Sequence, residues 1–214
     1  MRIACLGGGP AGLYFAISMK LRNAAHQVTV IERNRSDDTF GWGVVLSDET
    51  LDNLEVNDPS SAAEIRRHFA YWDDVALQIG GERIVSTGHG FCGIGRKKLL
   101  SVLQQRATAL NVDLRFETEV ESIEHYKDEY DIVVASDGLN SKTRQHNADV
   151  FNPDIEERLC PFVWLGTTQT FADAFTFIFE QTEHGWVWAH AYQFDDNTAT
   201  FICLLYTSPS PRDS

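Results

Sequence analysis

The stretch "IACLGGGPAGLYFA", residues 3–16, places a group of glycines between an apolar run and a helix-like run. Residues 2–7, "RIACLG", have the composition of a short buried strand, and from Pro10 onward the apolar residues recur at helical spacing. The glycines therefore lie where a strand turns into a helix. This pattern predicts a strand–turn–helix unit that binds a dinucleotide, because a helix N-terminus attracts phosphate groups.

Three glycines of this turn have separate predicted roles. Gly7 permits the tight turn, Gly9 lets a pyrophosphate approach the backbone, and Gly12 lets the helix pack closely on the strand. The next apolar run, "VTVIER" at 28–33, carries Glu32 twenty residues after Gly12. A carboxylate at that place is expected to hold a ribose hydroxyl of the dinucleotide. The alternative is a turn that is merely rich in glycine.

A second stretch, "GHGFCG" at 88–93, matches the same glycine pattern. The residues before it, 75–87, alternate about Gly80-Gly81 as in a hairpin, and the next helix is expected only near Lys97. A dinucleotide-binding turn needs a strand before it and a helix directly after it. We therefore interpret residues 88–95 as a flexible loop that is a candidate for contact with substrate.

The pattern of residue types along the chain changes after about residue 152. Before it, helix-like and strand-like runs alternate, as in "RKKLLSVLQQRATAL" at 96–110 followed by "VDLRFET". After it, aromatic and β-branched runs predict an antiparallel sheet. The expected fold is α/β: a Rossmann-like dinucleotide-binding domain over 1–152 and the start of a mainly antiparallel β-sheet substrate domain over 153–202. The hairpin within 72–90 is expected to join the substrate-domain sheet.

Composition and charge narrow the classes of partner. Eighteen basic and thirty-one acidic residues give a net charge of −13, which disfavours nucleic acid and anionic membrane surfaces as partners. The sequence has no signal-peptide pattern and no run near the ~20 apolar residues of a spanning helix, so a cytoplasmic location is expected. The cysteines lack metal-ligand spacing, which predicts no metal site, and Cys5 is expected to be a buried, inert thiol.

The stretch "YDIVVASDGLNSKTR", residues 130–144, bears on which dinucleotide is bound. A strand ends in Asp137-Gly138, and Ser141 and Arg144 follow at fixed spacing. This resembles the D-G-x-x-S-x-x-R fingerprint of the flavin-dependent aromatic hydroxylases, single-component monooxygenases that hold FAD on a Rossmann-like domain. The resemblance favours FAD, and 1–152 is then the FAD-binding domain. The alternative is a helix cap followed by a solvent-facing basic residue.

The resemblance extends over most of residues 1–202. Stretches such as "GWGVVLSDETL", "STGHGF", "VWLGTT" and "FTFIF" are similar to the hydroxylases of aromatic acyl-CoA thioesters (salicylyl-CoA and 2-aminobenzoyl-CoA). They are more loosely similar to the tryptophan hydroxylase of violacein synthesis. The resemblance implies a monooxygenase with FAD as cofactor, NAD(P)H as co-substrate and a small aromatic substrate, for which a CoA thioester is a candidate.

The resemblance also implies a set of site residues. The pyrophosphate and adenosine of FAD are assigned to the first turn and to the end of the second strand, and further flavin contacts to later positions. These cofactor-binding residues are Gly7, Gly9, Pro10, Ala11, Gly12, Glu32, Arg33, Arg96, Val120 (by its backbone), Asp137 and Gly138. His89 and His190 are candidate contacts with substrate, although histidines in such settings are more often structural. No residue is assigned a catalytic role.

The last stretch, "CLLYTSPSPRDS" at 203–214, has no apolar periodicity and is rich in Ser and Pro. It is similar to a translated adapter used in sequencing-library preparation, so we expect it to be a non-native tail and the chain to be a truncated fragment. A second flavin motif, Gly-Asp, is then missing, and the fragment is expected to be inactive. Two other functions remain open: an NAD-dependent dehydrogenase using the same strand–turn–helix, and a noncatalytic FAD-binding or lipid-handling protein.

Overall fold

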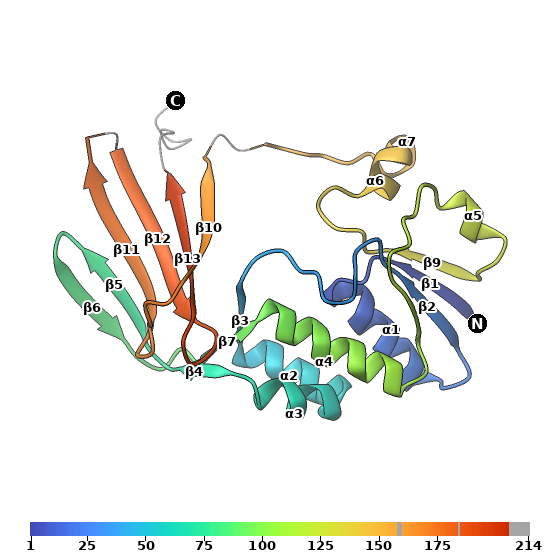
Figure 1. The fold of residues 1–214 in the computed structure, drawn as a ribbon. Helices are drawn as coiled ribbons and strands as arrows, with labels where there is room; N and C mark the ends of the chain where they lie inside the picture. The colour runs from blue at the N-terminus through green and yellow to red at the C-terminus, as the bar shows by residue number, and fades with distance from the viewer. Residues whose placement is uncertain (158–159, 184, 206–214) are drawn as a thin grey trace. The chain divides into compact units, whose positions relative to one another are not determined.

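A computed structural model describes residues 1–157, 160–183 and 185–205, and these residues form two compact units (Figure 1). The first unit combines residues 1–39, 54–64 and 97–155. The second combines residues 40–53 and 65–96 with the described residues from 156 onward. Each unit is therefore assembled from segments that are separated in the sequence. For the whole protein, the expected domain limits at 152 and 202 stay a prediction.

The first unit is built on a four-stranded parallel sheet with the order β8-β2-β1-β9. The central strand β1 pairs in parallel with β2 on one side and with β9 on the other. Its residues Ile3, Ala4 and Cys5 are fully buried, as expected for a strand covered on both faces. The four strands are β1 (Arg2–Leu6), β2 (Gln27–Ile31), β8 (Asp113–Arg115) and β9 (Ile132–Ala135).

Helix α1 (Pro10–Arg22) follows β1 directly and contacts both β1 and β2. Its buried residues Leu13, Ala16 and Ile17 recur at helical spacing, so one face of the helix covers the sheet. Tyr130 and the segment around Val120 pack against Ala4, Leu6 and Ile31 in a separate cluster. The sheet is thus covered on both faces. The other helices are α2 (Asp48–Asn57), α3 (Pro59–Arg66), α4 (Arg96–Ala109), α5 (Glu124–Lys127), α6 (Lys142–His146) and α7 (Ala148–Phe151).

A buried ion pair joins α4 to the junction between α2 and α3. Asp58 is 1% exposed, and its two carboxylate oxygens accept hydrogen bonds from Arg106 Nε (2.9 Å) and Nη2 (2.8 Å). The Ser61 hydroxyl also donates to Asp58. Burial alone raises the pKa of Asp58, but the bonds from Arg106 and Ser61 outweigh it and hold the pKa below its usual value.

The second unit contains a six-stranded sheet with the order β10-β13-β12-β11-β5-β6. The hairpin β5–β6 turns at Gly80 and Gly81, both at positive φ, and β5 pairs with β11. Except for the parallel β5–β11 pair, all neighbours in this sheet are antiparallel. The strands are β5 (Val75–Ile79), β6 (Glu82–Ser86), β10 (Phe162–Thr167), β11 (Phe175–Thr182), β12 (Gly185–Gln193) and β13 (Ala199–Leu205).

A smaller sheet with the order β3-β7-β4 completes the second unit. Its strands are β3 (Gly43–Ser47), β4 (Ala70–Trp72) and β7 (Phe91–Gly95). The prediction of a loop through residue 95 was wrong, because 91–95 form β7 between two antiparallel partners. The reason is close packing: a Cβ at Gly93 would lie 2.3 Å from the Gln193 carbonyl oxygen, so only glycine fits in this strand.

The expected non-native tail begins within described residues and continues beyond them. Cys203 and Leu204 belong to β13, where they pair with Val163 and Phe162 of β10. Residues 206–214 lie outside the described part of the chain, so the tail interpretation stays a prediction there. No helix among the described residues is long and apolar enough to cross a bilayer.

Candidate functional site

The glycines between β1 and α1 differ sharply in the space around them. A Cβ at Gly7, which has a φ of +113°, would lie 2.3 Å from the Ser136 carbonyl oxygen. A Cβ at Gly12 would lie 2.1 Å from the Gly7 carbonyl oxygen. A Cβ at Gly9 would have no heavy atom within 4 Å. Gly7 and Gly12 are therefore required by packing, whereas the bare backbone at Gly9 faces open space.

The N-terminus of α1 opens at this same place. Gly9 is the N-cap residue, and no side chain caps the helix. Pro10 occupies the first helical position, where its missing N–H costs nothing. The N–H groups of the first turn and the helix dipole therefore favour an anion beside Gly9.

Glu32 lies at the carboxyl end of β2 and reaches the glycine turn. Its Oε2 accepts the Gly8 N–H at 2.7 Å, and its Oε1 accepts both the backbone N–H (2.8 Å) and the side-chain Nδ2 (2.7 Å) of Asn34. These bonds fix the carboxylate next to the turn, where sequence analysis placed it. The contribution of Asn34 and Gly8 to this position was not anticipated, because no spacing rule singles them out.

The D-G-x-x-S-x-x-R segment forms a turn held by its own side chains. Asp137 Oδ1 accepts the Ser141 hydroxyl at 2.7 Å and Oδ2 accepts the Thr143 N–H at 3.1 Å. Ser141 caps α6 by accepting the Arg144 N–H, which confirms the helix-cap interpretation for this residue. Burial alone raises the pKa of Asp137, but the bonds from Ser141 and Thr143 outweigh it and hold the pKa low. The Asp137 carboxylate is thus ionised and engaged within the turn.

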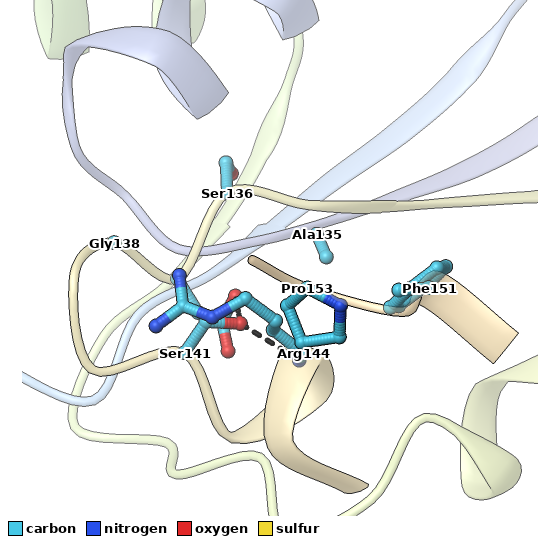
Figure 2. Close-up of a pocket in the computed structure, with 8 residues that line it drawn as sticks. Ala135, Ser136, Gly138, Ser141, Arg144, Phe151 and Pro153 are labelled. Atoms are coloured by element: carbon cyan, nitrogen blue, oxygen red, sulfur yellow. Dashed lines mark hydrogen bonds between the residues drawn. The ribbon is translucent and has the colours of Figure 1, made fainter. Parts of the chain in front are cut away.

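A cleft of about 460 Å³ lies beside this turn, at the carboxyl end of β9 (Figure 2). Figure 2 shows the Arg144 side chain between Ser141 and Pro153. One Arg144 nitrogen, Nη2, donates to the Leu139 carbonyl, while Nε is buried without a hydrogen-bond partner. Phe151 and Pro153 supply the apolar side of the cleft, and sequence analysis did not identify them.

Ser136 connects the two motifs of the first unit. Its hydroxyl donates to the carbonyl oxygens of Leu6 (3.0 Å) and Gly7 (3.1 Å), and its own carbonyl lies against Gly7. The end of β9 and the turn after β1 are therefore packed directly on one another. Sequence analysis missed Ser136, although its place immediately before Asp137 was a signal.

The remaining cofactor candidates belong to both units. Arg33 is exposed beside Glu32, and the Val120 side chain packs on the core cluster of Ala4 and Leu6. Arg96 belongs to the second unit, where its backbone N–H donates to the Trp42 carbonyl and its Nε is buried without a partner. Gly138 has a φ of +82° with open space around it. Their expected contacts with FAD stay predictions.

Both candidate histidines belong to one chain of aromatic contacts in the second unit. The ring of His89 stacks on Phe91 (6.3 Å between centroids), Phe91 meets Phe175 edge to face (5.7 Å), and Phe175 meets His190 (5.9 Å). His89 Nε2 hydrogen-bonds to the Ser86 hydroxyl at 2.8 Å, whereas His190 Nδ1 is buried without a partner. Burial lowers the pKa of His190, so its ring is neutral at neutral pH.

The loop before β7 is held by an acidic side chain. Asp73 accepts the backbone N–H groups of Gly88 (3.1 Å) and Gly90 (3.2 Å), and its carbonyl accepts the N–H of His89. This arrangement fixes the backbone beside His89. The described residues contain no group of three His, Cys, Asp or Glu arranged as metal ligands.

Comparisons with known proteins agree with this geometry. Residues 1–149 match the family described as FAD binding domain. The chain is 44% identical over 202 residues to salicyloyl-CoA 5-hydroxylase of Streptomyces sp, with 94% of this chain and 39% of that protein covered. It is 30% identical over 211 residues to 3-hydroxy-4-methyl-anthranilyl-[aryl-carrier protein] 5-monooxygenase of Streptosporangium sibiricum, with 99% of this chain and 59% of that protein covered.

The fold is also found among solved structures. The tetrameric form of 2-methyl-3-hydroxypyridine-5-carboxylic acid oxygenase superposes with a TM-score of 0.80 at 20% sequence identity. The match covers 95% of this chain and 58% of that one. The chain thus spans roughly two fifths to three fifths of the proteins that it matches.

Proposed function

The chain belongs to the FAD binding domain family, and from this premise we propose that it is part of an FAD-dependent monooxygenase. The proposed reaction uses NAD(P)H and dioxygen to hydroxylate a small aromatic substrate. The observation that carries the proposal is the glycine turn after β1, whose open position at Gly9 meets an uncapped helix N-terminus and the Glu32 carboxylate. This combination suits a pyrophosphate joined to an adenosine ribose.

The residues of the first unit fit FAD. The N–H groups of Ala11 and Gly12 bind the pyrophosphate, with Gly9 giving it room and Gly7 permitting the tight turn. Glu32 accepts a ribose hydroxyl through Oε2, because a carboxylate has about four acceptor sites and the bonds from Gly8 and Asn34 occupy three of them. When held by these residues, FAD would supply the redox chemistry, namely hydride acceptance from NAD(P)H and reaction with dioxygen.

The protein contributes position and the exclusion of water to this chemistry. Asp137 and Ser141 hold the turn after β9, and the turn keeps the Gly138 backbone bare beside the cleft. Arg33, Arg96 and the backbone at Val120 are proposed as further FAD contacts. No side chain is assigned to proton transfer in the first unit.

We propose an aromatic acyl-CoA thioester as the substrate. The 44% identity to a protein named salicyloyl-CoA 5-hydroxylase supports this choice, as does the aromatic character of the sheet in the second unit. His89 and His190 are the proposed polar contacts near the substrate ring. The cytoplasmic location expected from the sequence stays a prediction.

Three other functions would give different results in flavin-content and activity measurements. A tryptophan-hydroxylase-like monooxygenase acts on the free amino acid rather than on a thioester. An NAD-dependent dehydrogenase binds no flavin, and the family assignment disfavours it. A noncatalytic FAD-binding protein holds flavin without consuming NAD(P)H, so activity measurements separate it from the proposed enzyme.

The full-length protein provides the test. We expect a bound flavin in its absorbance spectrum and NAD(P)H oxidation that salicylyl-CoA or 2-aminobenzoyl-CoA stimulates. Absence of flavin after reconstitution with FAD contradicts the proposed cofactor. Stimulation by free tryptophan and by neither thioester moves the assignment to the tryptophan-hydroxylase-like alternative. Bound flavin without substrate-stimulated NAD(P)H oxidation supports the noncatalytic protein.

A further inference from the structure

One face of the six-stranded sheet carries aromatic rings from two adjacent strands. Phe177 pairs with His190 and Phe179 with Trp188, and directly paired residues share a face of the sheet. The ring contacts agree with this register. We call this surface the aromatic face; its members are Phe175, Phe177, Phe179, Trp188, His190 and Tyr192.

His190 is the polar centre of the aromatic face. Its ring centroid lies 5.9 Å from those of Phe175 and Phe177 and 5.5 Å from that of Trp188. The other members present carbon rings, apart from the Trp188 indole N–H and the Tyr192 hydroxyl, and that hydroxyl donates to the Gly43 carbonyl at 2.8 Å. The imidazole of His190 is half-buried, and its Nδ1 has neither solvent contact nor a hydrogen-bond partner.

An unpartnered buried nitrogen is unusual and calls for a cause. Most buried polar atoms in native proteins have a partner, and leaving one without a partner is unfavourable. The register adds a second case on the same face: His190 pairs with Ile202, and Ile202 pairs with Trp164, whose Nε1 is also buried without a partner. Two buried nitrogens without hydrogen-bond partners therefore lie in one row across the sheet.

Rings of β4 and β7 cover Phe175 and Tyr192, and the row through Phe177 is the part of the aromatic face that stays accessible. Leu77 of β5 pairs with Phe177, and Ile84 of β6 pairs with Leu77, so both lie in the same row as His190. Leu77 is 39% exposed and Ile84 is 54% exposed. The row therefore combines exposed apolar side chains, partly exposed rings and a neutral imidazole. A flat apolar ring that carries one hydrogen-bonding group matches these features in both shape and polarity.

We propose that His190 is a specificity residue, which hydrogen-bonds the ring hydroxyl or ring amine of an aromatic substrate lying on the aromatic face. This inference rests on the proposed function and deepens it, since it selects ring-substituted aromatic compounds over unsubstituted ones. A neutral imidazole has one donor and one acceptor nitrogen, so it can serve a hydroxyl or an amine. The aromatic rings on either side hold the substrate ring without discriminating between substituents.

The test uses the full-length, FAD-loaded protein and two thioesters that differ by one ring hydroxyl. Salicylyl-CoA carries a ring hydroxyl, and benzoyl-CoA lacks it; binding is measured from the change in flavin absorbance, and turnover from NAD(P)H oxidation. We expect the unaltered protein to bind salicylyl-CoA at least ~10-fold more tightly, because a site built to pair a hydroxyl rejects an analogue that lacks it. His190→Phe is expected to remove this preference, so that the two thioesters bind equally.

Further variants separate hydrogen bonding from packing. His190→Asn, which keeps a polar side chain on this face, is expected to restore part of the preference. Phe177 is a neighbour on the same face, and Phe177→Leu is expected to weaken the binding of both thioesters equally. If His190→Phe fails to retain FAD or to fold, His190→Leu takes its place. FAD content and the unfolding midpoint are recorded for every variant.

Two outcomes overturn this inference alone, and a third also overturns the proposed substrate. Retention of the salicylyl preference in His190→Phe overturns the inference while leaving the proposed function intact. Loss of the preference in Phe177→Leu as well also overturns it, because the effect is then one of packing. If the unaltered FAD-loaded protein responds to neither thioester in binding or turnover, the proposed thioester substrate fails, and this inference fails with it.

Discussion

Replacement of Gly9 by alanine separates the two roles that glycines have in the turn after β1. In the structure, Gly9 has φ −72° and ψ 177°, an extended conformation that alanine adopts without strain. A Cβ at this position would meet no heavy atom within 4 Å. We therefore expect Gly9→Ala to change the stability of the FAD-free protein by no more than about 1 kcal/mol, because alanine restricts the unfolded chain but is less favourable than glycine at a helix N-cap.

The same methyl group occupies the space through which a pyrophosphate approaches the backbone. We expect FAD affinity to fall at least ~10-fold, which corresponds to about 1.4 kcal/mol. The matched control is Gly12→Ala, whose Cβ would lie 2.1 Å from the Gly7 carbonyl oxygen. That variant is expected to lose about 1–3 kcal/mol of stability, because backbone atoms must move to admit the methyl group.

Two measurements on the full-length protein check this prediction. Denaturant unfolding of the FAD-free protein gives the stability of each variant, and titration with FAD, followed by flavin fluorescence, gives the affinity. Unchanged FAD binding in Gly9→Ala refutes the assignment of the open position to the pyrophosphate. A loss of stability in Gly9→Ala as large as that in Gly12→Ala refutes the structural distinction between the two glycines.

Further predictions concern other residues of the first unit and one of the second. Glu32→Ala should weaken FAD binding by about 1–3 kcal/mol, because the ribose loses a charged acceptor. Equilibrium dialysis with FAD measures this change, and Glu32→Gln should weaken FAD binding by less. Arg106→Ala should lower the free energy of unfolding by about 3–5 kcal/mol at neutral pH, because Asp58 is left charged and buried. The pKa of Asp58 is lower in the folded state than in the unfolded state, so its stabilising contribution is complete above the unfolded pKa of ~4 and is lost as pH falls through the folded pKa. Denaturant unfolding of the unaltered protein and of Arg106→Ala from pH 7 to 3 should therefore show the stability difference between them shrinking. The thiols of Cys5 and Cys92, whose pKa burial raises to about 12, should resist alkylation by iodoacetamide until the protein unfolds, and rapid labelling of both in the native protein would contradict this.

Several local features followed from the sequence because short-range physics fixes them. The run before Gly7, the glycines and the periodic residues after Pro10 specify β1, its turn and α1, since strand, turn and helix each depend on neighbouring residues. The hairpin at Gly80-Gly81 followed in the same way from alternation around a glycine pair. The buried state of Cys5 was also correctly predicted.

Other features needed the tertiary structure because they depend on residues far apart in the chain. The strand at 91–95 was mistaken for a loop, since Gly93 makes sense only against Gln193. Ser136 is positioned by hydrogen bonds to the carbonyl oxygens of Gly7 and Leu6, which lie about 130 positions earlier in the chain. The aromatic face exists only because β11 and β12 pair in the register that sets Phe177 beside His190.

The sequence by itself determined the dinucleotide-binding turn and, through its resemblance to a family, the identity of FAD as cofactor. Both depend on spacings of a few residues, which are visible in a linear string. Only the tertiary structure decided that Gly9 faces open space, that Asp137 is engaged by Ser141, and that the His190 Nδ1 is buried without a partner. Burial and hydrogen-bond satisfaction are properties of packed neighbours, and strand register and loop geometry choose those neighbours after the local elements have formed.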